Sequence, residues 1–168
     1  KYAEWYYGPQ RRLFTALTAD INSRNTWFDK ANMVFAYQKI DEDRVSRKYG
    51  VEDRIIRQEN VGVITGNFSF FKTVDSVRSF QYGLEAGYND VVSEAYAENV
   101  YDSTRSYATT RYPDGGSTMQ SYGCFLTYEW QLSPSFLLNT GVRYNQFMVK
   151  ANFIDPSTYQ LSFNELLK

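Results

Sequence analysis

Residues 120–132 read Gln120-Ser121-Tyr122-Gly123-Cys124-Phe125-Leu126-Thr127-Tyr128-Glu129-Trp130-Gln131-Leu132, and this stretch decides the fold class. The even positions are mostly apolar and the odd positions are mostly polar or small. Successive side chains of a strand point to opposite faces, so the stretch predicts one long strand with an apolar and a polar face. After the turn at residues 132–135, the even positions of residues 136–148 repeat the pattern with Phe136, Leu138, Val142, Tyr144 and Met148.

The same alternation extends toward the N-terminus. It predicts strands at Arg11 to Ile21, Phe28 to Arg47, Ile55 to Phe71 and Ser79 to about Asn99. Residues 1–9 are predicted as a loop because they end in Gly8-Pro9, residues 101–116 as a long loop, and the tail from Ile154 as another excursion with a turn at Asp155-Pro156-Ser157. The prediction is an all-β fold, an antiparallel up-and-down meander of six to seven strands.

Composition agrees with an all-β chain. Aromatic residues make up 18% of the 168 residues, with 15 Tyr and 12 Phe, and aromatic side chains favour pleated surfaces. No run of 18 or more apolar residues is present, so we expect no membrane-crossing helix. The net charge is −1 and the basic residues are scattered, which argues against a nucleic-acid partner.

Two further regularities concern the ends of the predicted strands. Connections at residues 22–27, 73–77 and 132–135 are short, and those at 48–54, 101–116 and after 153 are longer. The short-turn ends gather the aromatic residues Trp27, Phe28, Phe71, Phe80, Trp130 and Phe136. Both habits are typical of outer-membrane β-barrels. The alternation alone leaves a soluble β-sandwich or small barrel open, because a sandwich also buries one face of each sheet.

The residue types exclude several chemistries. The chain has no His, which removes Ser/His and Cys/His catalysis and zinc sites built on His, so we predict no catalytic residue, no metal site and no cofactor. The run Asp41-Glu42-Asp43 beside Arg44 offers oxygen ligands for a hard cation, but a solvated strand extension explains it better. Cys124 lies on the predicted apolar face and is interpreted as a small hydrophobic residue.

Candidate binding residues lie in the long loop and on the polar face. Residues 101–116 carry Arg105, Tyr107, Arg111 and Tyr112, and such side chains bind anionic aromatic ligands such as ferric catecholates or haem by charge pairing and stacking. An ordinary exposed loop is the alternative. Glu85 and Arg143 are predicted on the polar face of different strands, where they touch a partner or simply hydrogen-bond in a wet interior.

Five short stretches carry a family resemblance. They are Gly8-Pro9-Gln10-Arg11-Arg12-Leu13, Trp27-Phe28-Asp29-Lys30-Ala31-Asn32, Ala36-Tyr37-Gln38-Lys39-Ile40-Asp41-Glu42-Asp43-Arg44, Thr110-Arg111-Tyr112-Pro113-Asp114-Gly115-Gly116-Ser117 and Thr140-Gly141-Val142-Arg143-Tyr144. In these the chain resembles the barrel domain of TonB-dependent outer-membrane receptors, especially Bacteroidetes-type siderophore, haem and colicin receptors.

The resemblance implies that residues 1–168 are a fragment of a barrel of ~22 strands, without the plug domain. It implies a function in active transport of a ferric siderophore, haem or similar ligand across the outer membrane of a Gram-negative cell, with the TonB complex as partner through the plug. We expect the isolated fragment to self-associate, because it has unpaired edges. The alternatives are a soluble β-sandwich binding module, for instance carbohydrate-binding, and an outer-membrane barrel enzyme.

Overall fold

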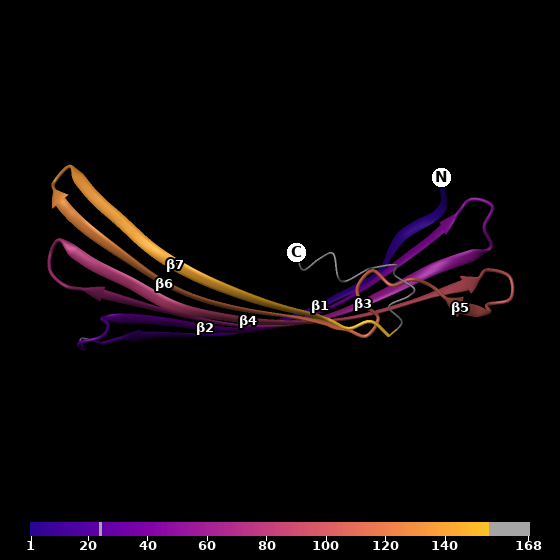
Figure 1. The fold of residues 1–168 in the computed structure, drawn as a ribbon, viewed down its shortest axis with the longest axis horizontal. Helices are drawn as coiled ribbons and strands as arrows, with labels where there is room; N and C mark the ends of the chain where they lie inside the picture. Colours follow the sequence, from indigo (N-terminus) through magenta and orange to yellow (C-terminus); the bar gives the residue numbers. More distant parts are fainter. Residues whose placement is uncertain (24, 155–168) are drawn as a thin grey trace, which may run out of the picture.

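The computed structural model describes residues 1–23 and 25–154, and its regular structure consists of strands (Figure 1). The strands are β1 (Tyr2–Asn22), β2 (Lys30–Lys48), β3 (Asp53–Thr73), β4 (Arg78–Asn99), β5 (Arg105–Tyr107), β6 (Ser117–Ser133) and β7 (Phe136–Ala151). Within the described ranges, no helix is long and apolar enough to cross a membrane.

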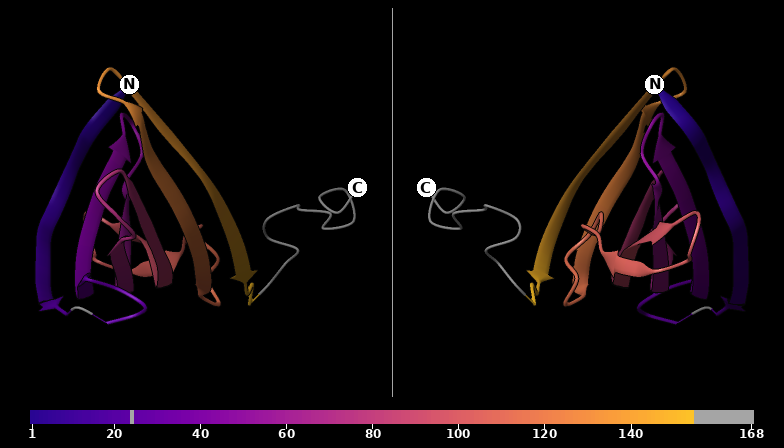
Figure 2. Two further views of the ribbon diagram at one scale, coloured as in Figure 1. Left: turned by 90° about the vertical axis from the view of Figure 1, so that its left-hand side faces the viewer. Right: turned by 90° about the vertical axis from the view of Figure 1, so that its right-hand side faces the viewer.

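All strands belong to one antiparallel sheet. The order is β1-β2-β3-β4-β6-β7, and the short β5 pairs with β4 outside this path. Each long strand therefore lies beside the next long strand in the chain, which confirms the predicted up-and-down meander. Figure 2 shows the strands fanned across a curved sheet, with β1 and β7 at its two edges.

The register places the predicted apolar residues of neighbouring strands on the same side of the sheet. Met33 on β2 is paired with Phe68 on β3, Phe68 with Leu84 on β4, Leu84 with Cys124 on β6, and Cys124 with Tyr144 on β7. We call the side of the sheet that carries these residues the apolar face, and the opposite side the polar face. Because paired residues point to the same side, the predicted alternating apolar positions gather on one face, although Phe71, Phe125 and Phe147 lie on the other.

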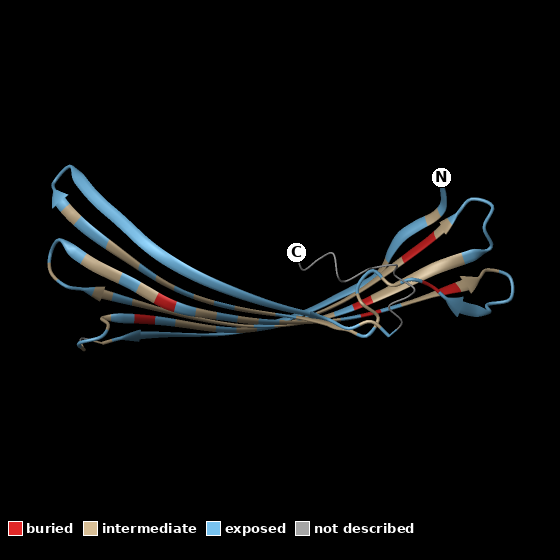
Figure 3. Ribbon diagram, viewed as in Figure 1, coloured by how far each residue is buried: buried red, intermediate tan, exposed pale blue. Residues whose placement is uncertain are grey.

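The sheet forms a single layer with almost no core. Among the described residues the buried hydrophobic ones are Ala31, Val45, Ala97 and Ala108, whereas Leu84 is 58% and Leu126 42% exposed. Figure 3 shows short buried segments on strands that are otherwise exposed or intermediate. A sandwich would cover those leucines with a second sheet. No such second sheet exists in residues 1–23 and 25–154, so the apolar face has no partner within this part of the chain.

Rings border the apolar face at both ends of a band. We call the half of each long strand near the turns at residues 23–29, 74–77 and 134–135 the lower half, and the remainder the upper half. At the lower end the Tyr128 ring packs 4.8 Å from Phe80 and 6.4 Å from Trp130, between ring centroids. Toward the upper halves, Tyr37 on β2 and Tyr88 on β4 flank Ile64 in register and form a second row, eight residues from Phe80 along β4, with Tyr122 on β6 two residues nearer the lower turns. The predicted gathering of aromatic residues at the turn ends is confirmed.

The N-terminal segment differs from the prediction. Residues 1–9 were expected to form a loop, but Tyr2 begins β1 and residues up to Tyr7 pair with the upper half of β2. Gly8-Pro9 marks a register shift between Tyr7 and Gln10 instead of a strand start. A Cβ at Gly8 would lie 2.6 Å from Cβ of Asp43, so only glycine fits this irregularity. Pro9 is not among the paired residues of β1, and proline is tolerated at such irregularities.

Two predicted loops also differ. The connection between β2 and β3 is a tight turn over residues 49–52, in which Val51 N donates to Lys48 O at 3.3 Å, and it is shorter than the connection over residues 23–29. The expected contrast between short and long connections therefore fails there. The loop at residues 101–116 contains strand β5. The predicted turn at Asp155-Pro156-Ser157 lies outside the described residues.

Candidate ligand-binding site

The polar face of the upper half carries two layers of charged side chains. Cross-strand pairing sets Glu42 on β2 opposite Glu59 on β3, and Glu59 opposite Ser93 on β4. One layer further from the turns at residues 23–29 and 74–77, Arg44 is opposite Arg57. Since like charges directly opposite each other are unfavourable, this arrangement needs compensating charges from elsewhere.

The segment at residues 101–116 supplies part of this compensation, because it folds back onto the polar face. Arg57 Nε donates to the backbone carbonyl of Thr109 at 3.1 Å, and Ala108 is buried. Arg111 Nη1 lies 3.7 Å from Glu42 Oε1 and 4.0 Å from Glu59 Oε2. One guanidinium from the segment therefore faces both opposed carboxylates.

Glu59 is the most deeply buried charged residue of this group. Its side chain is only 4% exposed, and neither carboxylate oxygen accepts a hydrogen bond from the described residues. Desolvation by burial raises the pKa of Glu59, an effect that Arg111 opposes and Glu42 reinforces. The adjacent Ser93 is 2% exposed, and its Oγ likewise has no hydrogen-bond partner among the described residues.

The four candidate residues of the segment fall on two sides of the sheet. The β5 register pairs Arg105 with Glu98 and Tyr107 with Tyr96, at positions of β4 that continue the apolar face into the upper half. Arg105 Nε donates to Glu98 Oε2 at 3.1 Å, and its guanidinium lies 4.3 Å from the centre of the Tyr96 ring. Arg111 instead faces the polar side, with the Tyr112 ring centre 5.6 Å from its guanidinium carbon. The structure therefore separates Arg105 and Tyr107 from Arg111.

A second charged row accompanies Arg105 on its side of the sheet. Glu4 on β1 binds Arg47 at 2.9 Å and Arg54 at 2.8 Å. Hydrogen bonds from Arg54 and then Arg47 lower the pKa of Glu4. These ion pairs join the upper halves of β1, β2 and β3, so we interpret them as structural.

The acidic run on β2 does not converge on one point. Asp41 and Asp43 are on the same side as Arg47, whereas Glu42 faces the polar side and pairs with Arg44 at 3.4 Å. In the part of the chain that the structure describes, no three His, Cys, Asp or Glu side chains are grouped to hold a metal ion.

Glu85 and Arg143 lie together on the polar face of the lower half. Arg143 Nη1 donates to Glu85 Oε1 at 3.2 Å, and Nη2 donates to Oε2. Arg143 Nε also donates to Asn145 Oδ1 at 2.9 Å. The predicted hydrogen bonding on this face is therefore confirmed.

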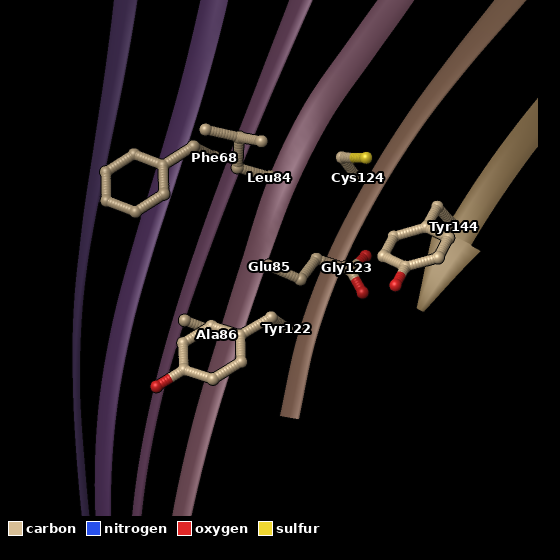
Figure 4. Close-up of a pocket in the computed structure, with 8 residues that line it drawn as sticks. All are labelled: Phe68, Leu84, Glu85, Ala86, Tyr122, Gly123, Cys124 and Tyr144. Atoms are coloured by element: carbon tan, nitrogen blue, oxygen red, sulfur yellow. The ribbon is translucent and has the colours of Figure 1, made fainter. Parts of the chain in front are cut away.

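An apolar hollow lies on the apolar face. Its lining comes from β3, β4, β6 and β7 and comprises Phe68, Leu84, Glu85, Ala86, Tyr122, Gly123, Cys124 and Tyr144 (Figure 4). The free Cys124 is exposed there between Leu84 and Tyr144. Binding sites need a few polar groups that orient the ligand, and the side chains of this face supply few. We therefore place the candidate site on the polar face.

Sequence reasoning did not identify Glu59, Ser93 or Arg57. Their proximity to Arg111 depends on register across three strands and on the fold-back of residues 101–116. The tight turn at residues 49–52 could have given the β2–β3 register, and with it the opposed Glu42 and Glu59.

Comparison with known proteins adds one finding. A family model described as TonB dependent receptor-like, beta-barrel matches residues 1–166, which include every strand. No curated protein and no solved structure matches the chain.

Proposed function

Because this chain belongs to the family of TonB dependent receptor-like β-barrels, we propose that it forms part of the wall of an outer-membrane transport receptor for an anionic iron chelate, either a ferric siderophore or haem. The family consists of outer-membrane receptors that transport ligands. The ligand class and the Bacteroidetes-type subgroup are the specific parts of the proposal.

The orientation of the wall follows from its two faces. On β4 the apolar band extends from Phe80 to Tyr88, nine positions with both rings included, and a strand needs about 9–11 residues to cross a bilayer. Exposed leucines such as Leu84 would meet hydrocarbon, and the aromatic rows would lie at the two boundaries with water. The polar face then lines the barrel interior, and the charged upper halves extend outside the cell.

The remainder of the receptor is also a proposal. Barrels of this kind close with ~22 strands around a plugged lumen, so further strands would pair with the edges at β1 and β7. A plug domain would fill the interior and connect the receptor to the TonB complex, which supplies energy for transport. The chain described here would contribute wall and one recognition segment.

The location of Arg111 supports the ligand class most directly. Its contacts with Glu42 and Glu59, at 3.7 and 4.0 Å, are too long for hydrogen bonds, so within residues 1–23 and 25–154 these two carboxylates leave donors of the guanidinium for another acceptor. Tyr112 lies beside it and offers a ring for stacking. An anionic chelate with aromatic groups would use both. Arg105 and Tyr107 lie on the opposite side of the sheet, and their binding of a ligand stays a prediction.

Uptake of iron by cells that carry the full-length receptor tests this proposal. The probes are a ⁵⁵Fe-labelled ferric tris-catecholate and ⁵⁵Fe-labelled haem, supplied to a host without other receptors for them. Arg111→Gln should lower uptake about tenfold or more, since one hydrogen bond to a charged group contributes roughly 1.5–3 kcal/mol. Arg105→Gln is the comparison variant: it removes the same charge from the same segment at the other predicted residue, on the opposite side of the sheet.

Three outcomes separate the parts of the proposal. A selective loss with Arg111→Gln, at equal receptor levels in the outer membrane, supports the assignment. Equal losses with both variants contradict the placement of the site on the polar face. No uptake of either probe by the wild-type receptor contradicts the ligand class.

A further inference from the structure

Within the described ranges, the buried carboxylate of Glu59 lies on the polar face without the hydrogen-bond partners that usually stabilise such a group. A charged group that is 4% exposed normally has hydrogen-bond partners, yet both oxygens of Glu59 and the neighbouring Ser93 Oγ have none among the described residues. A buried carboxylate without hydrogen-bond partners destabilises the folded chain, so its presence on the polar face calls for an explanation.

The charges that face Glu59 come from three elements. Arg111 approaches from the segment at residues 101–116, Glu42 and Arg44 from β2, and Arg57 from its own strand. Burial disfavours the carboxylate, Glu42 adds repulsion, and the three arginines favour it. The charged form of Glu59 therefore depends on these arginines, including Arg111.

Arg111 is the one of these arginines that a ligand can reach most readily. It belongs to a connecting segment, its side chain is 36% exposed, and it makes no hydrogen bond to Glu59. Arg44 donates hydrogen bonds to Glu42 and to the Tyr7 hydroxyl, and Arg57 donates one to the backbone carbonyl of Thr109. A competing anion would therefore draw Arg111 away first.

We propose that Glu59 is the internal counter-ion of Arg111, that an anionic ligand displaces it, and that one proton from the solvent then neutralises Glu59. Ligand binding is in this way coupled to uptake of a proton. The charge balance is simple: the ligand brings the negative charge that Arg111 needs, and the proton removes the negative charge that Arg111 no longer compensates. This inference rests on the proposed function, because it assumes that Arg111 binds the ligand.

The test measures binding of haem and of a ferric tris-catecholate to the purified full-length receptor between pH 5.5 and 8.5. Uptake of one proton weakens binding by at most tenfold per pH unit as pH rises. Glu59→Gln cannot take up that proton, so its affinity should depend less on pH and exceed that of the wild type at pH 8. Both proteins bind the same probe, so any titration of the probe changes both slopes equally and does not affect the difference between them.

Two further variants distinguish this role from a structural one. Glu59→Asp retains a titratable group and should retain the slope. Glu98→Gln removes a carboxylate that pairs with Arg105 on the other side of the sheet, so it should bind with the wild-type slope. Calorimetry in two buffers of different ionisation enthalpy should count about one more proton per ligand for the wild type than for Glu59→Gln.

The results that overturn the inference differ from those that overturn the proposed function. Tight binding with equal slopes in wild type and Glu59→Gln overturns the displacement of Glu59 and leaves the ligand class intact. Loss of binding in Glu59→Gln without a change of slope assigns the residue a structural role and likewise overturns the inference. No binding of either probe at any pH overturns both.

Discussion

Arg143 on β7 reaches across β6 to bind Glu85 on β4 through two hydrogen bonds. The path passes over Gly123, where an added Cβ would lie 3.1 Å from Arg143 Nη2 and 3.0 Å from Asn145 Oδ1. Three strands are thus connected on the polar face by one ion pair, and an added Cβ at residue 123 would make the ends of the Arg143 and Asn145 side chains shift.

Gly123→Ala should therefore break this pair. Side chains of both partners are more than a third exposed, so the pair contributes less than about 1 kcal/mol. The measurement is a double-mutant cycle with Glu85→Gln, using the temperature at which the purified receptor loses its folded mobility in gels. Once Gly123→Ala is present, Glu85→Gln should have no further effect. Additive effects of the two substitutions would contradict the coupling.

Leu84→Arg should prevent stable insertion of the receptor. Leu84 is 58% exposed on the apolar face, and a cation at the middle of the bilayer costs about 2–4 kcal/mol in a barrel. Leu126→Arg on β6 should have a similar effect, because Leu126 is also exposed on that face. The readout is the amount of folded receptor in outer-membrane fractions.

Asn67→Arg provides the control for this prediction. Asn67 is paired with Glu85 on the polar face, so the new cation would lie beside a carboxylate in the barrel interior. It should insert normally. Equal loss of insertion for Asn67→Arg and Leu84→Arg would contradict the assignment of the two faces.

Acidification should detach the upper end of β1. The pKa of Glu4 is lowered by its bonds to Arg54 and Arg47, so the contribution of these ion pairs is present above the ordinary value of 4.5. It is lost as pH falls through the lowered pKa. Hydrogen exchange at residues 2–7, corrected for the intrinsic rate, should therefore accelerate in the wild type as pH falls below the ordinary value of 4.5. Glu4→Gln should show fast exchange at neutral pH already, and an unchanged rate in that variant would contradict the prediction.

The 168-residue chain should associate when it is produced alone in water. Its large apolar side chains are exposed across one face, and β1 and β7 present strand edges. Sedimentation in buffer should show assemblies, and detergent above its micelle concentration should reduce them. A stable monomer in buffer would contradict the interpretation that the apolar face requires a cover.

The strands and their faces could be predicted because they depend on local sequence. Alternation with a period of two positions assigns Leu84 and Leu126 to one face and Glu85 and Arg143 to the other. This assignment does not depend on how the neighbouring strands pair. The first part of β1 escaped prediction because Tyr2 to Tyr7 lack alternation and Gly8-Pro9 resembles a break, whereas its second part was predicted as the strand Arg11 to Ile21.

The candidate site depends on contacts between distant residues. Arg105 and Arg111 look alike in the sequence, yet one is paired with Glu98 on β4 and the other reaches Glu59 on β3. Only the path of the segment at residues 101–116 across the sheet distinguishes them. Burial of Glu59 follows from that path as well, so no local pattern indicated it.

The wall is one sheet thick, and this constrains how its gene can change in length. Deleting or inserting a single codon within a lower half would move every later side chain of that strand to the opposite face. Polar side chains would then face lipid, and apolar side chains would face the barrel interior. The irregularity at Gly8-Pro9 accommodates such an offset, but it lies in an upper half. Relatives should therefore differ in length beyond the tyrosine row at Tyr37 and Tyr88, and the lower halves should keep a constant number of codons.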